Sequence, residues 1–291
     1  MSYSIQNQWV IATFKTEGAE LTSLKRRDLD IEYLWSGDAT YWGRHAPVLF
    51  PIVGRLKDDS YHYQGQTYHM SQHGFARDKE FQVTEVGDEF IRFSLSADEK
   101  TLAVYPFRFK LEIEYRLEQN QLICSYHVTN EGETEMFYSV GGHPAFNVPI
   151  DGQGSFADYY LDFYPMKSRL LLPLQGAYVD EDAVTLGQTN TRIAIQRELF
   201  KQDALIYQTT GENSFSIRSD KTDRAVTVMF DNMDFVGIWS PYPKEAPFVC
   251  IEPWQGIADT VTSNGNLEEK KGIQRLTPQA SQVNSYTIRL D

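Results

Sequence analysis

The chain has 291 residues, of which 41% are hydrophobic and 23% charged, values typical of a globular protein with a sizeable core. The formal net charge is −13 and no basic stripe occurs, which argues against a nucleic-acid partner, because such partners are bound by clustered Lys and Arg. Residues 1–14 lack a cationic leader, and no apolar run could span a bilayer. We therefore expect neither export nor a membrane partner, and a cytoplasmic location.

Alternating apolar and polar residues predict short β-strands along the chain. The clearest run is Phe107–Glu118, where every second residue is apolar and the residues between are charged, as in a strand with one buried and one wet face. Leu122–Val128 alternates likewise after the polar turn Gln119–Gln121, which predicts an antiparallel hairpin. The other runs of this kind are Trp9–Phe14, Phe81–Val86, Phe90–Leu95, Phe215–Arg218, Ala225–Phe230, Phe235–Trp239, Phe248–Ile251 and Val283–Leu290.

No long segment keeps the 3.6-residue period of a helix, and strands do not alternate with helices. These patterns predict an all-β fold, a large antiparallel sandwich or barrel, as a single domain over residues 1–291. Segment 151–202 is the least regular, and its strands are not placed. Cys124 and Cys250 lie in apolar strand-like runs, so we expect both to be buried free thiols.

The stretch FPIVGRL at 50–56 ends an apolar run with Gly54 and Arg55. An arginine that emerges at a strand end in this way suits a binding role. A surface ion pair explains the same pattern equally well.

The stretch SQHGFARDKEF at 71–81 places His73 before Gly74, where a tight turn would leave the imidazole exposed to a cleft. His69 lies four residues earlier, a spacing that binds metal when both histidines share a helix face. The β-like residues around them argue against a helix, so we expect no metal site.

The stretch SVGGHPAFNVPI at 139–150 holds His143 between two glycines and a proline, within an otherwise apolar segment. A lone histidine is more often a core or surface residue. A merely structural histidine would not need this irregular backbone, and the flanking residues therefore favour a functional role.

The stretch APFVCIEPWQGIAD at 246–259 places Glu252 directly after a buried strand and before Pro253. A partly desolvated carboxylate at such a strand end can act as a general base near neutral pH, although an exposed strand-end glutamate is the plain alternative. Two tryptophans lie nearby, Trp254 and, in the preceding strand, Trp239. Each either forms a flat apolar surface beside a sugar ring or packs in the core.

Other chemistries lack their motifs. The sequence has no Gly-x-Gly-x-x-Gly opening a helix, no phosphate-binding loop, no Gly-x-Ser-x-Gly elbow and no His-x-His pair. The remaining class of reaction is acid–base chemistry that needs no cofactor.

Three sequence motifs resemble those of the aldose 1-epimerase (galactose mutarotase-like) family, and within it the LacX-type branch: HGFAR, GGHPAFN and CIEPWQGIAD. The resemblance spans nearly the whole chain, up to LEEKKGIQRLTP near its end. It implies a large antiparallel β-sandwich with an open sugar-binding cleft.

The resemblance also assigns residues to roles. His143, in the family's His-Pro/Ser-x-Phe-Asn motif, corresponds to the catalytic acid, and Glu252 corresponds to the catalytic base. Substrate-binding positions match Arg55, His73 and, over a shorter stretch of similarity, Asp203; Trp239 is added as a wall of the sugar site. Ala145 stands where galactose-type members usually carry Tyr, which leaves the identity of the sugar open.

We therefore expect a mutarotase that interconverts the anomers of a free aldose, with a small sugar as its partner and no cofactor, as a monomer or homodimer. One alternative is a carbohydrate-binding protein without catalysis. A second is a glycosidase or lyase that pairs Glu252 with Asp203 or Asp231. A third is an epimerase of a hexose phosphate, with Arg77 or Lys79 as the cation.

Overall fold

A computed structural model describes residues 1–291, and nearly all of its regular structure is β-strand. The predicted all-β antiparallel fold is confirmed, because antiparallel ladders build all the large sheets. The nine-stranded sheet has the spatial order β20 (Ile193–Ala194), β15 (Tyr159–Tyr164), β22 (Asn213–Ser219), β23 (Thr222–Phe230), β27 (Ser281–Leu290), β11 (Gln121–Asn130), β10 (Phe109–Glu118), β9 (Phe90–Ser96) and β8 (Gln82–Val86).

A second large sheet carries the functional site. Its strands are, in spatial order, β19 (Thr185–Gly187), β16 (Arg169–Leu171), β21 (Leu205–Gln208), β24 (Phe235–Trp239), β25 (Phe248–Gln255), β13 (Val140–Gly142) and β5 (Val48–Leu49), with β14 (Ala145–Asn147) also paired to β25. The N-terminal sheet has the order β1 (Ser2–Gln6), β2 (Val10–Lys15), β3 (Leu21–Arg26) and β4 (Ile31–Glu32).

The remaining elements are short. Three two-stranded pairs join β6 (Ser60–Tyr63) to β7 (Gln66–His69), β12 (Met136–Tyr138) to β26 (Gln274–Leu276), and β17 (Leu174–Gln175) to β18 (Tyr178–Val179). The one α-helix, α1, is Glu99–Leu102, and 3₁₀ turns occupy Lys57–Asp59, Ala76–Asp78, Ile150–Gly152, Phe156–Asp158, Glu181–Ala183, Arg197–Phe200 and Leu267–Glu269. None of these helices has the length and apolar character that a membrane crossing requires.

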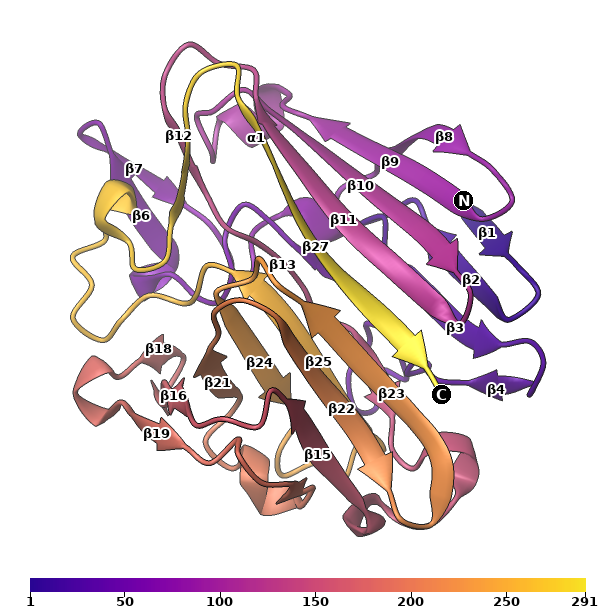
Figure 1. The fold of residues 1–291 in the computed structure, drawn as a ribbon. Helices are drawn as coiled ribbons and strands as arrows, with labels where there is room; N and C mark the ends of the chain where they lie inside the picture. The colour runs from indigo at the N-terminus through magenta and orange to yellow at the C-terminus, as the bar shows by residue number, and fades with distance from the viewer.

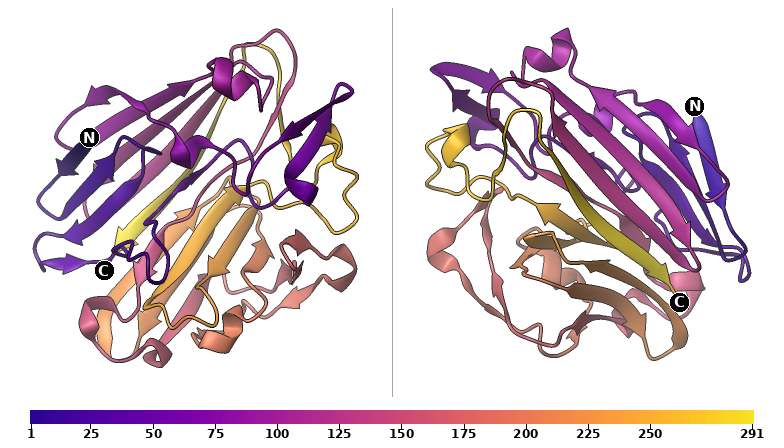
Figure 2. Two further views of the ribbon diagram at one scale, coloured as in Figure 1. Left: turned by 180° about the vertical axis from the view of Figure 1, so that it is seen from behind. Right: turned by 45° about the horizontal axis from the view of Figure 1, so that its top comes forward.

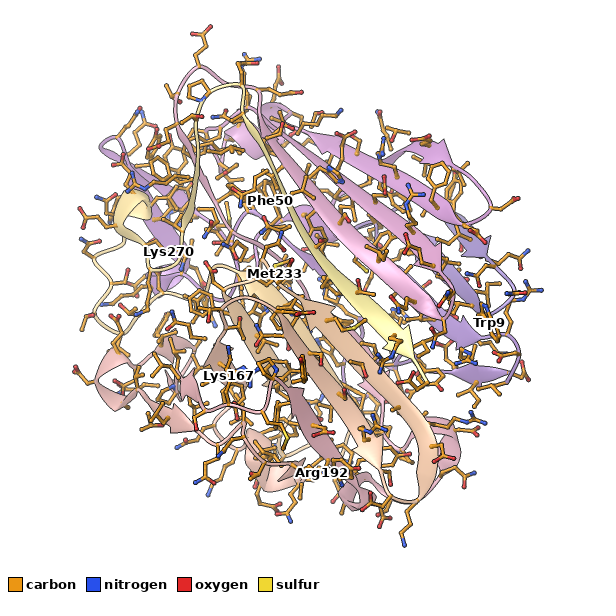
Figure 3. The ribbon with its side chains drawn as sticks, in the orientation of Figure 1. Trp9, Phe50, Lys167, Arg192, Met233 and Lys270 are labelled. Atoms are coloured by element: carbon orange, nitrogen blue, oxygen red, sulfur yellow. The ribbon has the colours of Figure 1, made fainter.

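The sheets form layers around a shared core. Figure 1 shows the nine-stranded sheet at the front with β24 and β25 behind it, and the view from behind in Figure 2 brings the N-terminal sheet and β24–β25 toward the viewer. Phe14 of β2 packs on Tyr115 of β10 with ring centroids 4.4 Å apart, which joins the N-terminal sheet to the nine-stranded one. In Figure 3 Phe50 and Met233 lie in the middle of the molecule, where both are buried, whereas Trp9 lies at its rim.

The predicted hairpin is the pair β10–β11. Glu118 lies opposite Gln121, so the turn is Gln119–Asn120, one residue shorter than predicted. Gln119 adopts a positive φ of 53°. This conformation fits a two-residue hairpin turn, whose backbone matches the twist of its strands.

Strand β25 is longer than the predicted run Phe248–Ile251, because it continues to Gln255. The strand thus contains Pro253, although a proline cannot donate to a ladder. Ile251 donates its N–H to the carbonyl of Pro144, so the nitrogen two residues on, in Pro253, points to the same side. The ladder on that side is interrupted between β13 and β14, so the missing N–H breaks no hydrogen bond. Glu252 therefore lies within a strand and not at its end.

The two faces of β24 and β25 have different partners. Val236, Ile238, Val249 and Ile251 point into the main core cluster. Because side chains alternate along a strand, the residues between them face the opposite way. That second face is also covered, which explains why every residue of β25 is buried.

Candidate active site

The second face of β24 and β25 forms the floor of a pocket of about 540 Å³. Glu252 and Trp254 from β25, Trp239 from β24 and Ile206 from β21 contribute to this floor. All six predicted site residues line this one pocket; they are Arg55, His73, His143, Asp203, Trp239 and Glu252. The structure thus brings together residues that are almost 200 positions apart in the sequence.

The register of the sheet places His143 beside Glu252. Strands β13 and β14 pair with β25 in one continuous register that is interrupted only at residues 142–144. Pairing resumes with Ala145 opposite Cys250, so the same register sets His143 opposite Glu252. Directly opposite residues of an antiparallel pair share a face and lie close together. The His143 Nε2 and Glu252 Oε2 atoms are 3.1 Å apart.

Both groups of this pair are withdrawn from water. Glu252 is 1% exposed and His143 is 7% exposed. Burial, followed by the negative charge of Asp203, raises the pKa of Glu252 well above its ordinary value. Burial lowers the pKa of His143 to about 3. Both shifts favour an uncharged pair, in which Glu252 carries the one titratable proton and His143 is neutral. This proton can pass between the two groups.

His73 is fixed as a hydrogen-bond donor to the pocket. Its backbone N–H donates to the carbonyl of Gly54 over 2.8 Å, and the N–H of Gly54 donates to Nδ1 of His73 over 3.1 Å. A neutral ring that accepts at Nδ1 carries its proton on Nε2. Burial, followed by the charge of His143, holds the pKa of His73 well below its ordinary value.

The turn around His73 depends on the neighbouring glycine. His73 and Gly74 have φ values of 67° and 72°. A side chain at Gly74 would bring its Cβ to 2.3 Å from the carbonyl oxygen of Phe50. Only glycine fits there, and the close approach turns the His73 ring toward the pocket.

Arg55 forms an ion pair and also lines the pocket, which are the two roles that the sequence left open. Its Nε and Nη2 donate to the two carboxylate oxygens of Asp59 over 2.8 and 2.7 Å, and the side chain also lines the pocket. A bidentate pair of this kind fixes the plane of the guanidinium. Its backbone is also anchored, since Asp259 donates its N–H to the Arg55 carbonyl. Lys270, labelled in Figure 3, is buried and donates to Asp259 over 3.0 Å.

Asp203 lies at the edge of the pocket, near the floor pair. Its backbone has a positive φ of 70°, a conformation that Asp tolerates better than most residues. Withdrawal of the carboxylate from water raises the pKa of Asp203, and a hydrogen bond from the Trp239 indole opposes that shift.

Two further pocket residues were not predicted as site residues. The Trp42 ring stacks on the His143 imidazole, with centroids 4.8 Å apart and planes at 26°. Trp42 lies in a segment without strand periodicity, so only its neighbourhood of aromatic residues hinted at a role. The sequence suggested Arg77 only as a cation that would bind the phosphate of a hexose phosphate, although this residue belongs to the HGFAR motif. Asp231 and Lys79, weighed in the alternatives, do not line the pocket.

Several buried polar atoms of pocket residues have no hydrogen-bond partner within the protein. They are Arg77 Nε, His143 Nδ1, Glu252 Oε2 and Trp254 Nε1. Buried polar groups in native proteins are nearly always paired. A ligand rich in hydroxyl groups can both donate to and accept from these atoms.

Metal-ligating groups meet at one place. His69 is exposed on β7 whereas His73 is buried at the pocket. A different set, His143, Cys250 and Glu252, brings a ring nitrogen, a thiol and a carboxylate oxygen within 4.8 Å of one another. Both cysteines are buried free thiols, as predicted.

The fold and the pocket define the class of the protein as a large β-sandwich of the galactose mutarotase-like type. The aldose 1-epimerase family profile matches residues 1–274. The chain therefore belongs to the aldose 1-epimerase family.

Individual relatives agree with this assignment. Protein LacX from Lactococcus lactis subsp. lactis is 32% identical and covers 100% of this chain and 99% of its own length, which confirms the LacX resemblance. The galactose mutarotase related enzyme from Lactobacillus acidophilus is 43% identical, with a TM-score of 0.99 over 100% of this chain and 97% of that chain. A galactose mutarotase-like protein from Lactobacillus casei is 32% identical, with a TM-score of 0.92 over 100% of both chains.

Proposed function

We propose that the protein is an aldose 1-epimerase that interconverts the α and β anomers of a free aldose. The observation that carries the proposal is the 3.1 Å contact between His143 and Glu252 on the floor of a pocket of about 540 Å³. A cavity of this size holds a small ligand such as a monosaccharide. Membership of the aldose 1-epimerase family supports the same reaction.

The reaction moves two protons around one carbon atom. The C1 hydroxyl loses a proton while the ring oxygen gains one, the C1–O5 bond breaks, and the resulting aldehyde rotates and closes on its other face. The shared proton first moves from Glu252 to His143 across their 3.1 Å contact. The Glu252 carboxylate then takes the C1 proton while His143 supplies its proton to the ring oxygen, and ring closure reverses both transfers. The two oxygens are bonded to the same carbon, so two groups in contact can serve both. A general acid or base of this kind contributes about 10²–10⁴ in rate.

The other pocket residues hold the sugar in register. His73 presents Nε2–H to a hydroxyl, and the Asp203 carboxylate accepts hydrogen bonds from others. Arg55 keeps a positive charge at the pocket wall, which steadies negative charge on a sugar oxygen. The Trp239 ring provides a flat apolar wall for the C–H groups of the sugar.

The proposal is tested by removing the acid and the base separately. Glu252→Gln and His143→Asn keep the shape of each side chain but remove its proton transfer, so each is expected to slow anomer exchange by about 10²–10⁴, followed by polarimetry. Exposed residues of the same types provide the controls Glu268→Gln and His69→Asn, which should exchange at the normal rate. Folded Glu252 and His143 variants with undiminished exchange would refute the proposal.

Other substrates and roles are separated by one panel of measurements. Anomer-exchange NMR over free aldoses and hexose 6-phosphates identifies the sugar, and a preference for phosphates would implicate Arg77, which lines the pocket. Sugar binding without faster exchange would indicate a carbohydrate-binding protein. Release of reducing ends from a glycoside would indicate a glycosidase that uses Glu252 and Asp203.

A further inference from the structure

Cys250 lies beside the acid–base pair, although the proposed reaction does not use it. Cys250 and Glu252 are two residues apart in β25, so both side chains point to the same face of the sheet. The thiol is fully buried, and the charge of Glu252 contributes to raising the pKa of Cys250. A ligating atom from each of Cys250, Glu252 and His143 lies within 4.8 Å of the other two.

The carboxylate of this cluster also has an oxygen without a hydrogen-bond partner within the protein. This atom is Oε2 of Glu252, and Nε2 of His143 lies 3.1 Å from it; both side chains are more than nine-tenths buried. An unpaired carboxylate oxygen that is buried beside a ring nitrogen is suited to a cation. The polar atoms are reached through the pocket, which both residues line.

The donor set selects the kind of cation. Thiolate and imidazole ligands favour Zn²⁺ and similar borderline or soft divalent ions over Mg²⁺ or Ca²⁺. Metal–ligand distances of about 2.0–2.3 Å place tetrahedral ligand atoms about 3.3–3.8 Å apart. The Glu252–His143 contact of 3.1 Å is already near this spacing, and the 4.8 Å limit leaves Cys250 only a small side-chain movement to make.

We propose that His143, Cys250 and Glu252 form a three-ligand site for Zn²⁺ whose fourth position faces the pocket, and that the bound ion inhibits the enzyme. The inhibition, but not the binding, rests on the proposed function. The ion takes the lone pairs that the base and the acid need, so proton transfer to the sugar stops. Binding releases the thiol proton of Cys250 and the proton held by the pair, so affinity rises with pH.

Binding is tested without any reference to activity. Metal-free protein titrated with Co²⁺ should develop a thiolate-to-cobalt charge-transfer absorption, which Cys250→Ala should abolish. Cys124→Ala removes the other buried thiol, which lies on β11, and should keep the absorption. His143→Asn should weaken it, which provides a second test if the Cys250 variant does not fold. Absence of the band in the unmodified protein, or its persistence in Cys250→Ala, would overturn the proposal.

Inhibition is tested by anomer exchange in the presence of buffered Zn²⁺, with each variant normalised to its own metal-free rate. Loss of a ligand should raise the Zn²⁺ concentration for half-inhibition by at least about tenfold in Cys250→Ser, with no change in Cys124→Ala. Equal inhibition of both variants, or activation by Zn²⁺, would contradict the inhibitory site. If the unmodified protein shows the cobalt band but exchanges no anomers, the proposed function fails while the metal site stands.

Discussion

His143 and Glu252 show how burial changes the chemistry of two neighbouring residues. Neither group has an ordinary proton affinity, because burial raises the pKa of one and lowers that of the other. Together they keep one proton in a place where bulk water does not compete for it. The two residues therefore act as a unit, and we expect the Glu252→Gln/His143→Asn double variant to be little slower than the slower single variant.

His73 provides a test of pH dependence at the residue scale. Its pKa in the folded protein is lowered, so below a pH of about 6.5 the unfolded chain binds a proton that the folded protein does not. The free energy of unfolding should therefore decrease as the pH falls through this range. In ¹⁵N NMR the ring should remain in the neutral Nε2–H form at a pH where a free histidine is charged.

The control for this effect is a comparison of two variants. His73→Gln should lose less stability than the unmodified protein between pH 7 and pH 5, measured by urea unfolding. His69→Gln, at an exposed position, should behave like the unmodified protein. A protonated His73 ring at pH 6 would show that the hydrogen bond from Gly54 does not fix its state.

At the scale of elements, β24 and β25 form the floor, and a glycine between large side chains makes this possible. Gly237 lies opposite Glu252, and a Cβ there would lie 2.4 Å from the Trp254 indole. Gly237→Ala should therefore lower the free energy of unfolding by about 1–3 kcal/mol and displace Trp254 into the pocket. Urea unfolding and the Michaelis constant for the sugar measure the two effects.

Gly43→Ala is the matched control for this substitution. A Cβ at Gly43 would meet only Ala39 at an ordinary contact distance of 3.6 Å. Its effect on stability should be small. Equal stability of the Gly237 and Gly43 variants would show that the floor tolerates an extra methyl group.

The elements also show what the sequence could and could not predict. Strands such as β10 and β11 were predicted because their alternation is long and regular. The strands in 151–202 are only two to six residues long, too short for periodicity to show in most of them. The extent of β25 past Pro253 depends on an interruption in its neighbours, which no local pattern encodes. Trp42 likewise enters the site only through tertiary contacts.

At the scale of the whole molecule, strands from β1 to β27 contribute to one core cluster of 62 residues. We propose that residues 1–291 form a single folding unit, as predicted. Heating should then produce one transition, with coincident curves from tryptophan fluorescence and circular dichroism and equal calorimetric and van't Hoff enthalpies. Two separable transitions would show that the sheets fold independently.

The pocket has a floor made of strands and walls made largely of connecting segments. Trp42, Arg55 and Arg77 all stand outside the strands, whereas Glu252 is held in the middle of one. Connections change more readily during evolution than the ladders they join. Members of the family can thus differ in the pocket walls while keeping the same floor, and exchanging wall segments between them would test whether the walls set ligand preference.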